Sequence, residues 1–445
     1  MVAPRTRNGR RPGQKRVNPC KYAQPNDVKI IEHEPVPNGS KGSGVTPNWP
    51  DVAKKTDRPR KTYRNARAAI IGLGIDCRHD VFHDRKLIDG ERLSDDFCSM
   101  LRQRIIDQFD FDAGKENVRD AAVQLCIESE FDPVLDYLDG LVWDGVPRVD
   151  TWLVELMGAQ DSALTREIGR LILIAAVRRV RKPGAKFDHV LVLEGPEGRM
   201  KSTAIVVLFG EDNFSDQTIL SVTDREQQEL VAGVWGYEIA ELAGMTKSEV
   251  EKIKAFITRT HDRARGAYKY FKVEAPRRCV FIATTNESEY LKSQTGNRRF
   301  WPVRVGNIDI DRLRSERDQL WAEAVLIERS GIPLILPDEL WAAAAAEQNA
   351  RLEIDPWEDR LVNVTGIFFA CDSIESDAGE WYAPGKYEWV RTDDLLTGPL
   401  GIAPERINPA TGRRLKPIMQ RLGWTAGRHY FGGVKRQRGY FRQIR

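Results

Sequence analysis

The stretch from Val190 to Phe209 constrains the fold of this chain more than any other. A short apolar run, Val190–Leu193, leads into Glu-Gly-Pro-Glu-Gly-Arg-Met-Lys-Ser-Thr, and a helical run follows from Ala204. A strand, a glycine-containing loop, a Lys-Ser pair and a helix together suit a nucleoside triphosphate, because loop amides and the helix N-terminus point at phosphate oxygens. The alternative is a glycine-containing turn with an accidental Lys-Ser pair.

The residue types in this loop predict how a nucleotide would be held. Lys201 is expected to bridge the β- and γ-phosphates, and the Ser202 hydroxyl is expected to bind Mg²⁺. Gly195, Gly198 and Thr203 complete the predicted nucleotide-binding set, so the expected cofactors are ATP and Mg²⁺. The pattern departs from the usual one at Met200, where a glycine normally precedes the lysine. This departure weakens the prediction of hydrolysis more than that of binding.

Two carboxylates, Glu238 and Glu241, stand at the end of the apolar run Val234–Ile239. Buried carboxylates are costly unless something pairs with them, and Mg²⁺ and a water to be polarised are such partners. Three residues of separation would place the two on opposite faces of a continuous strand. One is therefore expected to act on the nucleotide. Glu241 is favoured as the catalytic and metal-binding acid, although the sequence does not separate the two, and solvated carboxylates on an edge strand are the alternative.

Polar residues at two later positions extend the predicted catalytic set. Asn286 ends another apolar strand, where its amide can orient water or touch the γ-phosphate, although Thr-Asn is also common turn chemistry. Arg298 and Arg299 precede Phe-Trp, and in a ring-shaped ATPase one of them would reach the γ-phosphate held by the neighbouring subunit. A surface salt bridge or aromatic stacking is the alternative for this pair.

The charge distribution indicates a polyanionic partner. The net charge is only +3, but residues 1–64 carry 15 Lys and Arg against 5 Asp and Glu, and residues 404–445 carry 11 against 1. For residues 1–64, a solvated tail that binds nothing explains the composition equally well. Residues 247–272 interleave cations with aromatics, which suits single-stranded nucleic acid through Lys269 and Lys272. A solvated helix face with a hairpin would have a similar composition.

Four regions are expected along the 445 residues. Residues 1–64 form a basic disordered tail, and residues 65–149 a helical accessory region. In that region Ser94 is expected to be a helix N-cap, and Asp144-Gly145 predicts a tight turn. Residues 150–345 alternate apolar strands with helices, which predicts an α/β fold with a three-layer P-loop NTPase core. Ser162 is expected to cap a helix over residues 162–180.

Residues 355–445 resemble a small winged-helix-like domain, with helices followed by a basic hairpin. Short helices are expected at Thr392–Leu396 and Pro404–Ile407, and an amphipathic helix from Arg413 is expected to end at Gly423. The hairpin strands are expected at Trp424–Tyr430 and Tyr440–Ile444. The nucleic-acid-binding residues expected there are Arg413, Arg414, Lys435, Arg436 and Arg438, unless the region is a cap packed on the ATPase.

Two further features of the sequence indicate a cytoplasmic protein. No apolar run approaches the length needed to cross a bilayer, and no apolar segment follows the basic N-terminus, so we expect neither a membrane partner nor a secretory signal. The cysteines are scattered without a CxxC pair, which is typical of reduced thiols.

Several of these segments together resemble the virulence-associated protein E family over about residues 135–345. They are Tyr137–Arg148, Lys186–Gly195, Glu238–Leu242, Ala283–Asn286, Gly296–Val303 and Gln319–Ala324. The resemblance implies a P-loop ATPase related to superfamily 3 and to poxvirus-type primase-helicases, usually encoded by a phage or a genomic island. It assigns nucleotide binding to Lys201 and Ser202, and the role of the acidic residue on the next strand to Glu238 or Glu241. It assigns the role of the polar sensor residue to Asn286 and that of the arginine finger to Arg298 or Arg299. Met200 departs from the family pattern.

The combined expectation is an ATP-driven DNA helicase or DNA-remodelling motor, assembled as a homo-oligomeric ring on single-stranded or forked DNA. It would serve the replication of a mobile element such as a prophage. Two alternatives stay open. One is a non-catalytic, nucleotide-gated DNA-binding protein, for which Met200 argues, and the other is an ATP-dependent small-molecule kinase.

Overall fold

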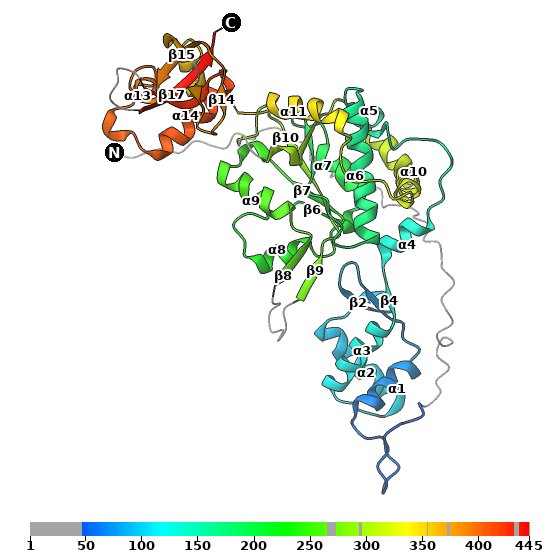
Figure 1. Cartoon of the computed structure of the whole chain (residues 1–445). Coiled ribbons are helices and arrows are strands. Elements are labelled where there is room, and N and C mark those ends of the chain that lie inside the picture. The colour runs from blue at the N-terminus through cyan, green and yellow to red at the C-terminus, as the bar shows by residue number, and fades with distance from the viewer. Residues whose placement is uncertain are drawn as a thin grey trace, which may run out of the picture. The chain divides into compact units, whose positions relative to one another are not determined.

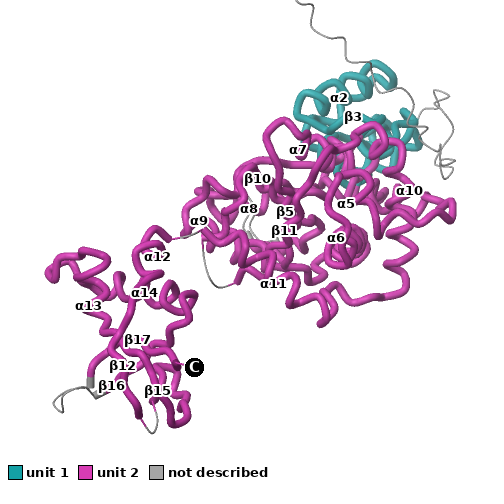
Figure 2. Tube along the Cα trace, turned by 90° about the horizontal axis from the view of Figure 1, so that it is seen from above, with its two compact units in different colours: residues 1–77, 88–126 teal, residues 78–87, 127–445 magenta. Residues whose placement is uncertain are grey.

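The computed structural model describes residues 47–264, 273–292, 296–353, 355–371, 374–430 and 436–444. The chain forms two compact units, coloured teal and magenta in Figure 2. The described part of the first unit runs to Cys77 and from Ile88 to Cys126, and the second unit comprises Arg78–Leu87 and Ile127–Arg445. Three of the predicted nucleic-acid-binding residues lie outside the described residues, namely Lys269, Lys272 and Lys435. The first 46 residues of the expected tail also lie outside them. The domain boundaries expected from the sequence stay predictions.

The first unit is mainly helical. Its helices are α1 (Tyr63–Gly72), α2 (Asp95–Phe109) and α3 (Lys115–Glu128). The predicted N-cap of α2 is confirmed, because Ser94 Oγ accepts a hydrogen bond from the Phe97 amide at 3.1 Å. A separate small sheet has the order β3-β2-β1-β4, namely β3 (Glu91–Arg92), β2 (Arg85–Ile88), β1 (Cys77–Asp80) and β4 (Glu130–Phe131). Apart from β3, Cys77 and Ile88, its residues belong to the second unit.

A five-stranded parallel sheet forms the centre of the second unit (Figure 1). Its strands, in spatial order, are β11 (Phe300–Arg304), β5 (Val190–Glu194), β10 (Val280–Thr285), β7 (Gly236–Ile239) and β6 (Phe214–Ser215). Three of them coincide with apolar runs read from the sequence. Because the strands are parallel, their carboxyl ends share one edge of the sheet, and polar residues placed there meet.

Both faces of this sheet are buried. Along β5, Leu191 and Leu193 belong to one hydrophobic cluster, whereas Val190 and Val192 belong to another. The first cluster contains the inward faces of α6 (Ala163–Arg181), α7 (Lys201–Phe209) and α10 (Ile310–Arg329), and the second that of α9 (Lys247–Ile257). The expected Ser162 cap of α6 is confirmed, with its hydroxyl 3.0 Å from the Thr165 amide. A parallel sheet between apolar layers makes this unit a mixed α/β structure.

The other elements before residue 353 are short. They are α4 (Pro133–Gly140), α5 (Trp152–Glu155), η1 (Glu211–Asn213), α8 (Asp224–Val231), η2 (Leu242–Gly244), β8 (His261–Ala264), β9 (Val273–Pro276), η3 (Asn297–Arg299), η4 (Asp338–Leu340) and α11 (Trp341–Ala350). Strands β8 and β9 pair antiparallel, so the cation-rich region from residue 247 is a helix followed by a strand pair.

Residues 355–444 carry an antiparallel sheet in the order β12-β15-β17-β16. Its strands are β12 (Ile367–Cys371), β15 (Gly385–Arg391), β17 (Arg436–Gln443) and β16 (Thr425–Tyr430). The other elements are α12 (Pro356–Leu361), β13 (Ile374–Glu375), β14 (Trp381–Tyr382), α13 (Thr392–Thr397), η5 (Pro404–Arg406) and α14 (Pro409–Arg421).

The C-terminal region differs from the sequence-based expectation in three ways. Strands β12 and β15 were not expected, the helix expected near Pro404 is a single 3-10 turn, and β17 begins at Arg436 rather than at Tyr440. The expected end of the amphipathic helix is confirmed, because Gly423 follows α14 with φ +82°. The winged-helix-like assignment stays a prediction. Within the described ranges, no helix is both long and apolar enough to span a bilayer.

Candidate functional site

The loop between β5 and α7 adopts a conformation that L-residues rarely take. Met200, the residue before the lysine, has φ 58° and ψ 30°, in the left-handed region. This geometry explains why glycine usually occupies the position, and Met200 adopts it with its side chain 49% exposed. Gly198 also has a positive φ, of 77°. A Cβ on Gly195 would lie 3.1 Å from the Val305 carbonyl oxygen, so a larger residue would crowd the start of the loop.

Lys201 is the first residue of α7 and is buried, with 7% of its surface exposed. Its Nζ donates hydrogen bonds to the carbonyl oxygens of Gly195 at 2.6 Å and Pro196 at 3.0 Å, and to Asn286 Oδ1 at 2.8 Å. Burial lowers the pKa of Lys201, against the opposing effect of nearby carboxylates. The predicted lysine and the predicted sensor amide, 85 residues apart, are thus in direct contact.

Glu238 lies in β7 and is the acid that touches the loop helix. Its Oε1 accepts hydrogen bonds from Ser202 Oγ and from Thr284 Oγ1, both at 2.7 Å. The side chain is 2% exposed, and its buried Oε2 has no hydrogen-bond partner among the described residues. Burying an unpaired carboxylate oxygen is costly, and a cation or its water would satisfy it. The hydroxyl and carboxylate oxygens present here fit Mg²⁺, which prefers such ligands.

Glu241 occupies a different position from the one that a continuous strand would give it. Strand β7 ends at Ile239, and Glu241 follows in a left-handed conformation, with φ 52° and ψ 47°, and is exposed. The argument from opposite faces of one strand therefore does not apply. Glu238 makes the contacts to Ser202, whereas Glu241 lies beyond the strand at the same edge of the sheet.

Arg298 and Arg299 are not brought to this site within one chain. They precede β11, whose first residue, Phe300, pairs with Val190 at the start of β5, whereas Arg304 pairs with Glu194 at its end. The arginines therefore lie at the opposite edge of the sheet, about 13 Å away at 3.3 Å per residue.

The two arginines also differ in their contacts. Arg299 Nε donates to Thr258 Oγ1 at 3.1 Å and lies 3.6 Å from an Asp188 carboxylate oxygen. Arg298 is exposed, and no side-chain partner is found for it among the described residues. Arg298 is therefore the one that is free to reach another molecule.

A buried cluster next to the loop escaped the sequence analysis. Glu194, the last residue of β5, accepts a hydrogen bond from Tyr290 Oη at 2.6 Å and binds Arg351 through both carboxylate oxygens. Burial raises the pKa of Tyr290, which keeps its hydroxyl a donor. A carboxylate ending an otherwise apolar strand was the available signal, but nothing in the sequence pairs it with Arg351.

The predicted nucleic-acid-binding residues of the C-terminal region fall into two groups. Arg413 and Arg438 are exposed. Arg414 instead binds both carboxylate oxygens of Asp355 at 2.8 Å and lies over the Trp357 ring at 4.0 Å. The backbone of Arg436 begins β17.

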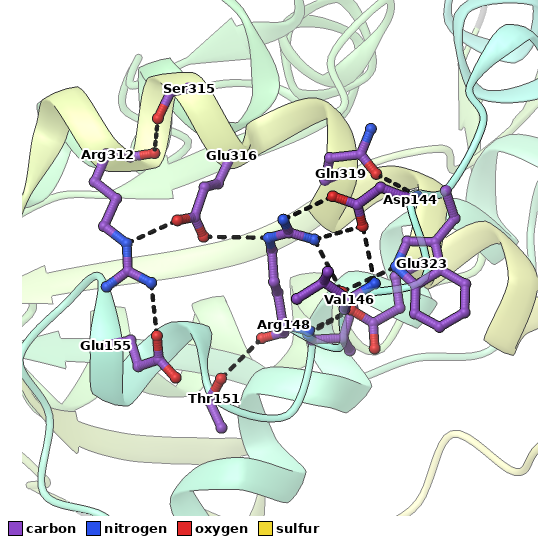
Figure 3. A network of polar contacts seen from close by, with 12 residues as sticks. Asp144, Val146, Arg148, Thr151, Glu155, Arg312, Ser315, Glu316, Gln319 and Glu323 are labelled. Atoms are coloured by element: carbon purple, nitrogen blue, oxygen red, sulfur yellow. Dashed lines mark hydrogen bonds and ion pairs between the residues drawn. The ribbon is translucent and has the colours of Figure 1, made fainter.

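The turn expected near Asp144-Gly145 is held on α10 by a polar network (Figure 3). Gly145 has φ +85°, and Arg148 pairs with Asp144 at 2.8 Å, which lowers the pKa of Asp144 to about 2. The carboxylate of Glu323, which is buried, accepts hydrogen bonds from the amides of Arg148 at 2.6 Å and Val149 at 2.9 Å. This segment therefore has a rigid structural role beside the core.

Comparisons with known proteins locate one family in the chain. The Virulence-associated protein E-like domain matches residues 138–353, in agreement with the resemblance read from the sequence. A comparison with curated proteins found no match. Among solved structures, the apo structure of the NrS-1 C terminal region (305-718) is 12% identical, with a TM-score of 0.46 over 84% of this chain and 98% of that chain. An A form apo structure of the same region is 11% identical, with a TM-score of 0.47 over 86% and 99% of the two chains.

Proposed function

We propose that this chain, whose residues 138–353 are a virulence-associated protein E-like domain, binds ATP with Mg²⁺ in the loop between β5 and α7 and hydrolyses it. The observation that carries this proposal is the convergence of Lys201, Asn286 and Glu238 at one edge of a parallel sheet. They come from the start of α7, from β7 and from the residue after β10. A purely structural turn has no need of a buried lysine and a half-satisfied buried carboxylate at the same place.

Each residue then has a distinct role. Lys201 would exchange loop carbonyls for the β- and γ-phosphates, and Ser202 and Glu238 would hold the metal, Glu238 through its hydrogen bond to Ser202 and its unpaired oxygen. When bound, Mg²⁺ neutralises charge on the phosphates. Asn286, already in contact with Lys201, would orient the attacking water, and the exposed Glu241 would accept its proton.

The placement of the arginines supports a multi-subunit ATPase. Because Arg298 and Arg299 lie at the opposite edge from Lys201, neither serves the nucleotide of its own chain. In a closed ring with head-to-tail contacts, the sheet edge that carries Arg298 and Arg299 in one subunit would face the loop between β5 and α7 of the next subunit. Together with the two basic ends, this supports a motor that acts on DNA in the replication of a mobile element.

A non-catalytic, nucleotide-gated DNA-binding protein is the competing proposal, and Met200 is its main argument. The backbone of Met200 adopts the left-handed conformation that the position requires, and its side chain is half-exposed. The substitution therefore leaves the loop geometry available, which favours hydrolysis.

The deciding experiment is an ATPase assay of the native chain with and without single-stranded DNA. Lys201→Ala is expected to abolish turnover, whereas Lys186→Ala, which removes an exposed lysine, is expected to leave it unchanged. Stimulation by DNA would support the motor and exclude a small-molecule kinase. If the native chain turns over no faster than Lys201→Ala, the ATPase proposal fails.

A further inference from the structure

A basic segment of the first unit, residues 51–64, forms an ordered turn and the first two residues of α1. We call it the basic turn. The amide of Ala53 donates to the Arg58 carbonyl and that of Arg60 to the Asp51 carbonyl, both at 2.9 Å. Val52 and Pro59 form an antiparallel bridge. The two arms of the turn are thus held together by backbone hydrogen bonds.

A fully buried amide fixes this turn to the helix that follows. Asn65, with 0% of its surface exposed, donates from Nδ2 to the carbonyls of Asp51 at 2.6 Å and Arg60 at 2.8 Å. Its Oδ1 accepts from the Asp51 amide at 3.0 Å, and Thr62 Oγ1 donates to the Asp51 carboxylate at 2.8 Å. Because every one of these buried polar groups is satisfied, the turn is a built structure, and the Asp51 carboxylate is already engaged within it.

The turn displays cations that the rest of the unit does not neutralise. Five of them are exposed and lack a carboxylate partner among the described residues, namely Lys54, Lys55, Arg58, Arg60 and Arg64. Three arginines elsewhere in this unit are paired, namely Arg102 with Asp112 at 2.7 Å, Arg104 with Asp89 at 3.5 Å and Arg119 with Asp120 at 3.2 Å.

Like charges held close together on an ordered turn repel one another. The turn has one exposed acid, Asp57, which offsets only part of that charge, so an anion from outside can relieve the rest. Lys61 differs from these five cations, because its Nζ lies 3.0 Å from Asp112 Oδ2 and is therefore paired within the unit. The five unpaired cations therefore favour an external anion that has several charges along its length. A nucleic-acid backbone has this property, and a single small anion does not.

We propose that the basic turn binds single-stranded DNA through its phosphate backbone, as a contact separate from any in residues 247–272 or in the C-terminal region. The choice of DNA rests on the proposed function. The choice of a single strand rests on Tyr63, the first residue of α1, which is 36% exposed among these cations. An aromatic ring between phosphate-binding cations offers a stacking surface to an unpaired base.

The test measures binding of a fluorescent single-stranded oligonucleotide to the full chain without ATP, over a series of salt concentrations. The variant replaces three cations, Lys54→Gln, Lys55→Gln and Arg58→Gln. A matched control replaces Arg92→Gln, Lys115→Gln and Arg119→Gln, which are exposed cations of the same unit outside the turn. Removing three phosphate contacts should make the plot of log association constant against log salt concentration less steep by about 2. It should also weaken binding at least tenfold at low salt.

The outcomes separate the alternatives. Weaker DNA binding by the turn variant alone supports the proposal. Equal weakening in the control variant would show an effect of net charge only and would overturn the proposal. Unchanged DNA binding by both variants would overturn it as well. Tyr63→Ala should weaken single-strand binding and leave duplex binding unchanged; equal weakening of both would overturn the single-strand assignment. The same measurements on Lys201→Ala separate this proposal from the ATPase, since the turn should bind DNA even in a chain that does not hydrolyse ATP.

Discussion

Arg351 binds both carboxylate oxygens of Glu194, at 2.6 and 2.8 Å, although 157 residues separate them in the chain. Glu194 directly precedes the loop between β5 and α7, and Arg351 follows α11. The amides of Tyr290 and Leu291 also donate to the Arg351 carbonyl, at 3.1 and 2.9 Å. This junction joins the start of the loop, the segment after Asn286 and the chain that leads to the C-terminal region.

Breaking this ion pair from one side is expected to destabilise the second unit. Arg351→Met leaves the Glu194 carboxylate buried without its cation, which costs about 3 kcal/mol of unfolding free energy. The double variant Arg351→Met, Glu194→Gln removes the unpaired charge and should recover part of that loss. Urea denaturation of the three proteins checks this, and a double variant no more stable than the single one would contradict it.

The two acids of the site should give different phenotypes. Glu238→Gln disturbs the hydrogen bond to Ser202, so it should weaken Mg²⁺-dependent nucleotide binding as well as turnover. Glu241→Gln removes a carboxylate that touches neither Ser202 nor Lys201, so it should retain binding and lose about 100-fold or more in turnover. Nucleotide binding by fluorescence and steady-state turnover separate the effects. Normal turnover in Glu241→Gln would remove Glu241 from the proposed chemistry.

Met200 should tolerate glycine better than a β-branched residue. The left-handed backbone costs an L-residue about 1 kcal/mol or more, and a branched Cβ raises the cost. Met200→Val should therefore lower the unfolding free energy by about 1 kcal/mol and slow turnover. Met200→Gly relieves the strain at the expense of chain entropy, so it should stay within about 1 kcal/mol of the native chain and retain full turnover. Thermal unfolding and ATPase assays test both, and loss of turnover in Met200→Gly would contradict the interpretation.

The sequence predicted the parts of this structure that depend on local pattern. Buried parallel strands are continuous apolar runs, so the runs at Val190 and Val280 located β5 and β10, and Ser94, Ser162 and Gly423 marked helix ends. Parallel pairing then implied that Lys201 and Asn286 would meet, as they do.

What the sequence did not predict depends on where a strand stops and on long-range contacts. The contact between Glu238 and Ser202 follows from the end of β7 at Ile239, and strand ends are not fixed by apolar pattern. The different environments of Arg298 and Arg299 depend on Thr258, which lies 41 residues away. Strands β12 and β15 were missed, although their aromatic and β-branched residues carry a strand signal.

Acid is expected to lower stability through His189. Its ring stacks on Trp301 with centroids 4.1 Å apart, and burial lowers its pKa below the usual 6.5. Above pH 6.5 the ring is neutral in both the folded and the unfolded chain, and it contributes nothing to the pH dependence of stability. As the pH falls below 6.5, the unfolded chain takes up a proton that the folded chain resists, so stability falls. The drop in melting temperature from pH 7.5 to 5.5 should be smaller in His189→Gln, and an equal drop would contradict the assignment.

Arg298 is expected to complete the site of a neighbouring subunit, which makes its loss detectable by mixing. Arg298→Ala should fold normally, because the side chain is exposed and has no side-chain partner among the described residues, and yet lose turnover by about 1000-fold. Arg299→Ala breaks contacts to Thr258 and Asp188, so it should lower the melting temperature as well. Mixing inactive Lys201→Ala with inactive Arg298→Ala should restore activity, because some interfaces then pair an intact loop with an intact arginine. Mixing either variant with itself is the control. If mixed subunits assemble with DNA and ATP and stay inactive, Arg298 does not act across the interface.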